Sequence, residues 1–174
     1  MGGFVSTYLA QAGAAARTAF ADRTNFALQS LGMIVNDGFV LVLWFMFFAG
    51  FRSVSRWRLA DVTLLMGLMM TIFGTAGMLF GGYRDMAATI LRGELEALLT
   101  QPKPVLARLL ARESIASAWG DALLGVVLLV GAAGIEPARA PLVLLAIVCG
   151  LTIHLSASVA FASLAFWIAG ARSF

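Results

Sequence analysis

The sequence predicts an all-α membrane protein with four transmembrane helices, an N-terminal interfacial amphipathic helix and a cytoplasmic helical elbow between the second and third spans. Three observations lead to this prediction. Hydrophobic residues make up 61% of the 174 residues and charged residues only 12%, against roughly 45–50% and about 25% in ordinary soluble domains. The apolar residues gather in four blocks, and a charged insert separates the second block from the third. By its length the chain, residues 1–174, is a single transmembrane domain.

Residues 1–24 are expected to form an amphipathic helix at the membrane surface. Apolar residues recur there at about helical spacing, whereas Gln11, Arg17 and Arg23 occupy other positions. An alanine-rich first helix without a special role is the alternative interpretation. The opening stretch has no basic region followed by an apolar core and a small-residue cleavage site, so we expect no removable signal peptide.

Four apolar blocks follow, and a spanning helix needs about 20 mainly apolar residues. Their approximate bounds are 26–51, 59–82, 115–134 and 141–169. The fourth block is too short for two crossings, which gives a count of four helices. Asn36 and Asp37 in the first block could instead mark a break before a shorter re-entrant segment. In the second block, Gly77 and Gly81 form a small-residue pair of the kind found where helices touch.

The basic residues indicate the orientation of these spans. With four crossings, the side that holds both termini and residues 83–113 carries two thirds of the lysines and arginines. The positive-inside rule therefore places both termini and this insert in the cytoplasm. Three arginines between the first and second blocks, within 52–58, argue for the opposite orientation.

Four polar residues lie within the apolar blocks: Asn36, Asp37, Asp121 and His154. A charge near the centre of a spanning helix costs on the order of 2.5–3.5 kcal/mol on insertion scales, so such groups usually face the interior of the helix bundle. They indicate either a polar translocation path or proton relay, or interhelical hydrogen bonds that fix packing. The neighbouring Gly120 favours packing for Asp121, and a lone histidine is also more often a packing residue. For Asn36 and Asp37 both interpretations remain open.

Residues 84–112 form the expected elbow. The first part, 83–99, has an apolar stripe at helical spacing, with charged residues mostly away from it. Pro102 and Pro104 must end this helix, because proline lacks a backbone donor and restricts the residue before it. A second short helix begins again at Val105. Two short amphipathic helices joined at a stiff corner need a partner surface, or the membrane interface, to cover their apolar stripe.

The sequence gives little support for catalysis, metal binding or nucleic-acid binding. The chain has one Cys and one His, and it lacks the H-E-x-x-H and G-x-S-x-G motifs, so we expect no enzymatic site and no metal. It lacks a Gly-rich phosphate loop, so we expect no ATP bound by that motif in this chain. The net charge of +3 fits basic loops facing anionic lipid better than nucleic acid as a partner. The apolar helices and intramembrane polar residues, taken without the elbow, would also fit an ATP-independent small multi-span channel or a membrane scaffold protein.

The elbow carries the clearest family resemblance. The run GELEALLTQPKPVL is followed by SAWGDALLG and preceded by DRTNFALQSLGMIVNDGFVLVLWFMFF and RWRLADVTLLMGL. These segments resemble the type-2 permease subunits of bacterial ATP-binding-cassette exporters. The shared features are a glycine-acidic-leucine motif ahead of a leucine pair and a proline, a Gly-Asp pair opening the third span, and an arginine-aromatic surface helix before the first. Here they correspond to Gly93, Glu94 and Leu95, then Leu98, Leu99 and Pro102, to Gly120 and Asp121, and to Arg23 to Phe26.

The resemblance covers most of the chain from about residue 15, with two departures. Permeases of this group usually have about six spans, so the chain resembles roughly the first two thirds of one. Either the protein is truncated to its first four spans, or the remaining spans lie outside this sequence. Their outer loop usually has a glycine before its tryptophan, whereas Arg56 precedes Trp57 here.

The resemblance implies a multi-pass subunit of the bacterial cytoplasmic membrane, paired with a second permease subunit of the same or a different chain. A dimer of separate ATPase subunits, which would hold ATP and Mg, would supply the energy. The elbow would dock in a groove of the ATPase through three leucine anchors, Leu95, Leu98 and Leu99. A charged rim would fix the register, formed by Glu94, Glu96, Arg108 and Arg112. The residues expected to take part in this coupling are Gly93, Glu94, Leu95, Glu96, Leu98, Leu99, Pro102, Arg108 and Arg112. The sequence does not indicate the substrate.

Overall fold

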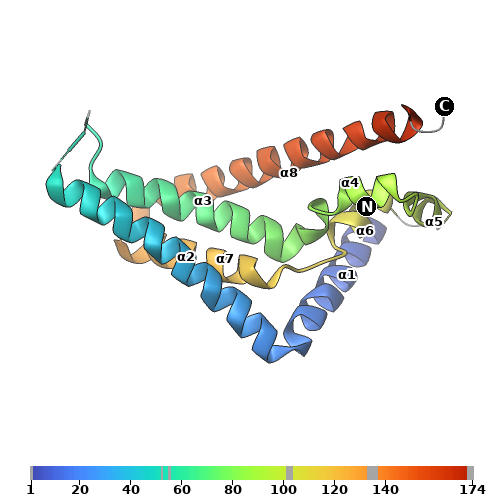
Figure 1. Ribbon diagram of the computed structural model, residues 1–174, viewed down its shortest axis with the longest axis horizontal. Coiled ribbons are helices and arrows are strands. Elements are labelled where there is room, and N and C mark those ends of the chain that lie inside the picture. Colours follow the sequence, from blue (N-terminus) through green and yellow to red (C-terminus); the bar gives the residue numbers. More distant parts are fainter. Residues whose placement is uncertain (1, 52, 55, 101–103, 133–136, 172–174) are drawn as a thin grey trace.

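The computed structural model describes residues 2–51, 53–54, 56–100, 104–132 and 137–171 (Figure 1). Within these ranges the regular elements are all helical, which confirms the all-α prediction. The α-helices are α1 (Gly2–Ala21), α2 (Arg23–Gly50), α3 (Leu59–Phe80), α4 (Met86–Leu91), α5 (Leu95–Leu99), α6 (Val105–Leu110), α7 (Ala116–Val127) and α8 (Ala140–Ala171). Short 3-10 turns, η1 (Gly81–Tyr83) and η3 (Pro137–Arg139), and a π-helical turn, η2 (Leu128–Ala132), complete the chain.

Among the described residues, three helical segments are long and apolar enough to cross a membrane: 23–50, 59–91 and 140–168. They correspond to the first, second and fourth apolar blocks of the sequence. The third block forms a shorter apolar helix, Ala116–Gly131, whose last turn widens into η2. Asn36 and Asp37 do not break α2, which runs without interruption from Arg23 to Gly50.

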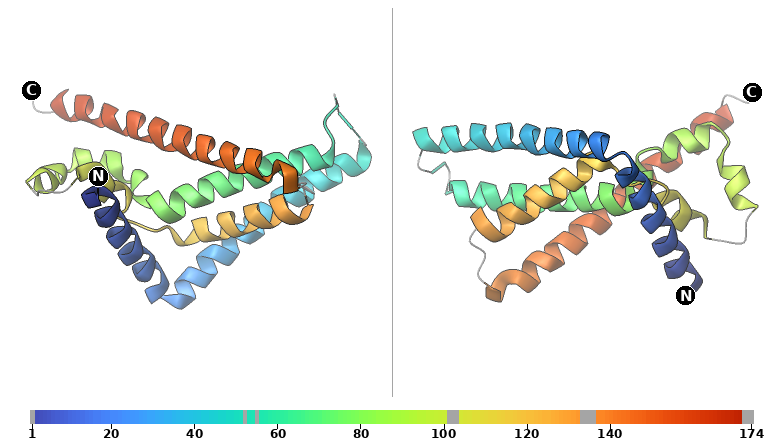
Figure 2. Two further views of the ribbon diagram at one scale, coloured as in Figure 1. Left: turned by 180° about the vertical axis from the view of Figure 1, so that it is seen from behind. Right: turned by 90° about the horizontal axis from the view of Figure 1, so that it is seen from below.

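The centre of the bundle is the contact of α7 with α2 and α3 (Figures 1 and 2). Glycine brings the backbones together, as expected for helices packing in lipid. A Cβ atom at Gly74 of α3 would lie 2.7 Å from Cα of Ala122, and one at Gly77 would lie 2.6 Å from Cβ of Ala118. On the other face of α7, a side chain at Gly120 would collide with the backbone of Ser30 in α2. The small residues thus determine how closely the three helices approach.

Helix α8 lies along α3 and reaches the elbow near its C-terminal end (Figure 1). No residue in its most apolar stretch is buried inside the chain, and Phe161 and Trp167 are largely exposed. Such a surface fits lipid as the surrounding solvent. The structure therefore supports a membrane protein with large lipid-facing areas on α2 and α8.

The predicted N-terminal helix forms as α1, and it meets α2 at a sharp corner (Figure 1). The corner is capped by Asp22, whose side chain accepts a hydrogen bond of 3.0 Å from the backbone N–H of Asn25, a standard helix N-cap. The rings of Phe20 and Phe26 pack with Trp119 at the start of α7. From this corner α1 runs back toward the elbow, which brings residues 8–19 close to residues far along the chain.

Candidate functional site

The elbow consists of three short helices, α4, α5 and α6, rather than the two predicted from the sequence. The predicted single helix over 83–99 is interrupted at Gly93, which has a φ of +73°. The N–H of Gly93 bonds to the carbonyl of Ile90 (3.1 Å), and that of Glu94 bonds to the carbonyl of Thr89 (3.2 Å). This pair of bonds is a Schellman cap, in which glycine tolerates the left-handed conformation at low cost. The glycine of the permease-like motif therefore ends one helix and turns the chain into the next.

The second predicted helix forms as α6, with Pro104 as its N-cap residue. The helix before it, α5, ends at Leu99. Pro102 lies outside the described residues, so the structure does not bear on its expected role.

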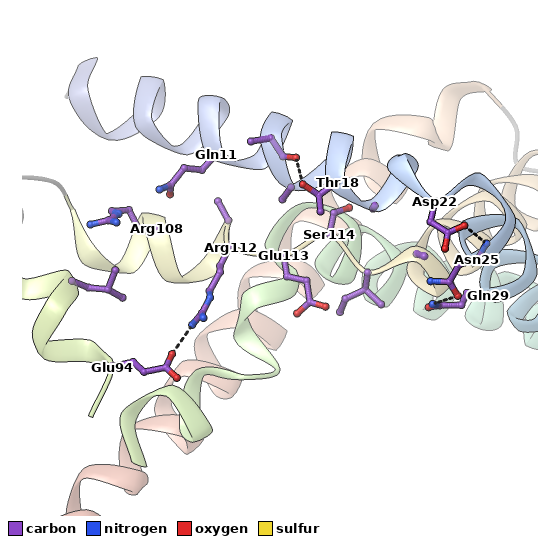
Figure 3. A pocket seen from close by; sticks show the side chains of 17 residues that line it. Gln11, Thr18, Asp22, Asn25, Gln29, Glu94, Arg108, Arg112, Glu113 and Ser114 are labelled. Carbon is purple, nitrogen blue, oxygen red and sulfur yellow. Dashed lines mark hydrogen bonds and ion pairs between the residues drawn. The ribbon is translucent and has the colours of Figure 1, made fainter. Parts of the chain in front are cut away.

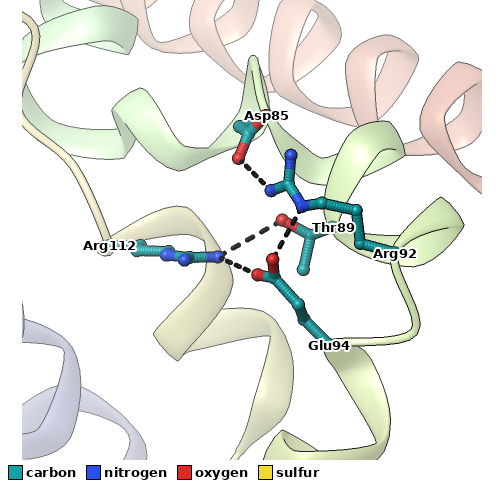
Figure 4. A network of polar contacts seen from close by, with 5 residues as sticks. All are labelled: Asp85, Thr89, Arg92, Glu94 and Arg112. Carbon is teal, nitrogen blue, oxygen red and sulfur yellow. Dashed lines mark hydrogen bonds and ion pairs between the residues drawn. The ribbon is translucent and has the colours of Figure 1, made fainter.

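A network of charged residues closes the elbow around the Gly93 turn (Figure 4). Arg92 pairs with Asp85 (Nη2 to Oδ2, 2.8 Å) and with Glu94 (Nε to Oε1, 2.6 Å). Arg112, which follows α6, reaches the other carboxylate oxygen of Glu94 at 3.2 Å and donates to Thr89 Oγ1 at 3.3 Å. Glu94 thus links the turn after α4 to the residues after α6. Two members of the predicted charged rim, Glu94 and Arg112, are paired with each other.

The apolar stripe of the elbow has an inner and an outer part. Leu95 and Leu98 are partly buried and pack against a core that includes residues of α8. The buried members of this core are Met86, Ile90, Leu109, Ala162 and Ala165. Leu99 instead exposes 63% of its surface, and Leu91 and Leu106 expose 42% and 46%. Of the three leucines expected to anchor a partner, Leu99 is the one that a partner can reach without opening the elbow.

A polar groove of about 690 Å³ separates α1 from the elbow (Figure 3). Gln11 and Thr18 of α1 line one side, and Arg108, Arg112 and Glu113 line the other. The Nε and Nη1 atoms of Arg108 and the Oε1 atom of Gln11 are buried without a hydrogen-bond partner among the described residues. A donor-rich guanidinium and an amide oxygen therefore lie in the same groove. The sequence placed Gln11 off the apolar stripe of α1, but it gave no signal that this residue lies near the elbow.

Close backbone contacts connect the elbow to the membrane helices. Gly82, just after α3, lies against the carbonyl of Leu109 in α6, where any side chain would collide. The N–H of Ile115 bonds to the carbonyl of Gly77 at 3.1 Å. The three elbow helices are thereby attached to the end of α3 and the start of α7.

Helix α1 is attached to the same end of α3. The hydroxyl of Tyr8 donates a hydrogen bond of 2.8 Å to the carbonyl of Leu79, and its ring stacks on Phe80 with centroids 5.2 Å apart. Burial raises the pKa of Tyr8 to about 12, so the phenol keeps its proton and its role as donor at neutral pH. A movement of α3 relative to the elbow therefore also acts on α1.

The structure brings together two of the four intramembrane polar residues. Asp37 of α2 and Asp121 of α7 are both buried, each with 7% of its surface exposed, and their side chains contact each other. Asn36 is exposed and donates a long hydrogen bond of 3.4 Å to Asp37 Oδ1. His154 lies apart from them on α8, edge-on to the rings of Phe73 and Tyr83. These positions form no group of three or more metal-ligand side chains within the described part of the chain.

We expect Glu94→Gln to loosen the elbow. The hydrogen bonds from Arg92 and then Arg112 lower the pKa of Glu94, so the ion pairs contribute fully above the pKa of the unfolded chain. That contribution is lost as pH falls through the lowered pKa of the folded state. At neutral pH the variant should show faster hydrogen exchange, corrected for intrinsic rates, at the amides of the Gly93 turn and α5. The side chains of Glu94, Arg92 and Arg112 are about half exposed, so the increase in exchange rate should be modest. It should shrink in high salt or in acid.

Glu96→Gln is the matched control for this experiment. Glu96 lies in α5, two residues after Glu94, is exposed, and makes no ion pair with a described residue. Its removal should leave the exchange rates of the turn unchanged. Equal effects of the two substitutions would mean that general charge, rather than the network in Figure 4, protects the turn.

Comparison with known families gives one match. A family model described as "ABC-2 family transporter protein" matches residues 34–173, which include most of α2, the whole elbow and α8. Comparison with curated proteins and with solved structures gives no match.

Proposed function

Because the chain belongs to the ABC-2 transporter family, whose members are membrane transport components, we propose that it is the membrane-spanning permease subunit of an ATP-driven exporter. The elbow would receive the motion of a separate ATPase subunit and pass it to the membrane helices. The observation that carries this proposal is a charged, internally braced elbow, joined to two apolar helices and presenting an exposed leucine face.

The face offered to the ATPase is the outer part of the elbow. Leu99, Leu91 and Leu106 are exposed apolar residues, and Glu96, in the same helix as Leu99, adds an exposed charge. Helices recognised in a groove are bound through such apolar anchors, while the surrounding charges determine register and selectivity. Leu95 and Leu98 support this face from inside the elbow. Arg108 and Arg112 line the groove toward α1, on the rim of the elbow.

The bracing of the elbow explains how a push could reach the membrane. Ion pairs hold the Gly93 turn to Arg112, and a shared core joins α4, α6 and α8. An element whose parts move together transmits a displacement instead of absorbing it. The elbow follows directly from α3 and leads through Ile115 into α7, so a push on Leu99 would tilt these two helices. Helix α1 offers a second route, because Tyr8 connects it to the end of α3.

The assembly that we propose contains two permease subunits, the same or different, and two ATPase subunits that hold ATP and Mg. The elbow must then face the cytoplasm, as the distribution of basic residues predicts, and both termini lie on that side. A bacterial cytoplasmic membrane fits this arrangement. A channel that works without ATP, or a membrane scaffold, is the alternative, but neither requires a braced elbow with an outward-facing leucine.

The test compares Leu99→Ser with Leu9→Ser. Both leucines expose 63% of their surface, but only Leu99 lies on the elbow. The tagged chain is purified in mild detergent, and the ATP hydrolysis activity that co-elutes is measured. Burying one leucine contributes about 1.5–3 kcal/mol, so Leu99→Ser should reduce the retained ATPase about 10-fold or more.

Leu9→Ser should retain the ATPase at the wild-type level. A conservative Leu99→Met substitution should also retain it. Transport by the chain reconstituted in vesicles without any ATPase would contradict the proposed function and favour a channel. Equal losses from Leu9→Ser and Leu99→Ser would remove the elbow as the docking face.

A further inference from the structure

Two carboxyl groups meet in the middle of the membrane helices. Asp37 lies halfway along α2 (Arg23–Gly50), roughly 20 Å from either end at 1.5 Å per residue. Asp121 lies in the first half of α7. Each side chain is nine-tenths buried, so neither is solvated by water at this depth. The position is therefore unfavourable for two separate negative charges.

The packing of α2 on α7 makes the two groups face each other. Ser30 Oγ donates a hydrogen bond of 2.7 Å to the carbonyl of Ala116 at the start of α7. Asp37 lies seven residues after Ser30, about two helical turns further on the same face of α2. Asp121 lies next to Gly120, which touches the backbone of Ser30. The side chains of Asp37 and Asp121 lie within hydrogen-bonding reach of each other where these two helices pack.

Each aspartate has an oxygen atom without a hydrogen-bond partner among the described residues. Asp37 Oδ1 accepts the bond from Asn36, whereas Asp37 Oδ2 accepts none, and neither does Asp121 Oδ1. Buried acceptors of this kind are rare, because each lost hydrogen bond with water is costly. One proton between two carboxyl groups makes one of them a donor, so it satisfies both vacant oxygens and removes one negative charge.

No nearby group in the described part of the chain supplies the positive charge that would neutralise a second carboxylate in place of this proton. Helix α3 packs on α7 beside them. From residue 62 of α3 to the end of η1, the one ionisable group is the phenol of Tyr83, and residues 122–132 of α7 and η2 contain none. On α2, Asn36 is neutral. Arg84, just after α3, acts electrostatically on Asp121, and it also acts on His154, which contacts Phe73 and Tyr83. Arg84 makes no ion pair with either aspartate among the described residues, so two carboxylates here would carry negative charge that their surroundings do not compensate.

We propose that Asp37 and Asp121 share one proton inside the membrane and that this proton holds α2 against α7. The bond is that of a carboxylic acid O–H donating to a carboxylate. When the proton leaves to water, two adjacent carboxylates remain, and their repulsion in a low-dielectric setting pushes α2 and α7 apart. The bundle then responds to protonation at a site that is independent of the elbow and of any ATPase.

The experiment uses the full chain in lipid nanodiscs and compares the wild type with Asp121→Asn. In the wild type, infrared spectra at neutral pH should contain the carbonyl band of a protonated carboxylic acid. This band should disappear on alkalinisation, and the melting temperature should fall with it. In Asp121→Asn the amide donates permanently to Asp37, so the band should be absent and the melting temperature should no longer depend on pH over the same range.

Two further variants complete the experiment. Asp37→Asn should behave like Asp121→Asn. Asp61→Asn is the control, because Asp61 caps α3 by accepting from the N–H of Arg58 at 2.8 Å and lies away from the pair. It should keep both the infrared band and its pH dependence. If the two asparagine variants fail to fold, the wild-type spectrum still decides the question.

Three outcomes would overturn the proposal. The first is a wild-type spectrum without a protonated carboxyl band. The second is a pH profile of Asp121→Asn that coincides with that of the wild type. The third is a rise in wild-type melting temperature with added sodium, potassium, magnesium or calcium at fixed pH, lost in Asp121→Asn, since a metal ion would then take the place of the proton.

Discussion

Replacing Gly74 with alanine is expected to lower the free energy of unfolding by about 1–3 kcal/mol, the usual cost of adding atoms to a well-packed interior. The new Cβ would lie 2.7 Å from Cα and 2.8 Å from Cβ of Ala122. Both are parts of a helix that cannot rotate away as a flexible side chain could. Helix α7 would have to move off α3 at the centre of the bundle. Unfolding of the chain in mixed micelles with increasing denaturing detergent measures the effect.

Gly38→Ala is the matched control for this prediction. Gly38 lies in α2, and a Cβ atom there would meet nothing within 4 Å. Alanine forms helix better than glycine by up to about 1 kcal/mol, so this variant should be as stable as the wild type or more so. If Gly74→Ala were also neutral, α3 and α7 would not be packed as closely as described.

Replacing Gly82 with alanine is expected to uncouple the elbow from the membrane helices. Its side chain would enter the space occupied by the carbonyl of Leu109, so α6 would have to move away from the end of α3. An overpacking cost of about 1–3 kcal/mol lowers the equilibrium constant for docking of the elbow roughly 5- to 150-fold. ATP-driven transport in reconstituted vesicles should fall by up to the same factor. Retention of the ATPase should fall much less, because the Leu99 face is unchanged.

Gly13→Ala tests whether this loss is specific to the position. Gly13 lies in α1, where a Cβ atom would also meet nothing within 4 Å, and transport should be unaffected. Transport at the wild-type level in Gly82→Ala would separate the elbow–α3 contact from function. A parallel loss of transport and ATPase retention would indicate that Gly82 supports docking itself.

The sequence predicted the membrane helices and the place of the elbow because both depend on composition over long stretches. It missed the break at Gly93, since the apolar stripe continues through that residue and periodicity does not report a positive φ. The Schellman cap depends on two backbone hydrogen bonds after Thr89 and Ile90. A glycine followed by an acidic residue within a helical pattern was the available signal for this turn.

The candidate site was predicted in its residues but not in its pairings. Glu94 and Arg112 are 18 positions apart, and the core beneath Leu95 and Leu98 includes Ala162 and Ala165 of α8. Such contacts depend on how the helices pack against one another. The periodicity of a single segment gives no information about that packing. The same holds for the contact of Asp37 with Asp121. Each was recognised as an unusual polar residue in an apolar block, but nothing in the sequence paired them.

The shortness of α7 has a consequence for the surrounding lipid. The apolar helix that the structure describes there, Ala116–Gly131, is roughly 24 Å long at 1.5 Å per residue, while the 32 residues of α8 reach roughly 48 Å by the same measure. The hydrocarbon layer is about 30 Å thick, so one helix falls short of it and the other exceeds it. Leu123, Val126 and Val130 of the short helix are exposed, so the bilayer beside them must become thinner. Helix α8 must tilt to keep its apolar length within the hydrocarbon layer. Hydrophobic mismatch therefore gives this bundle an intrinsic preference for bilayer thickness.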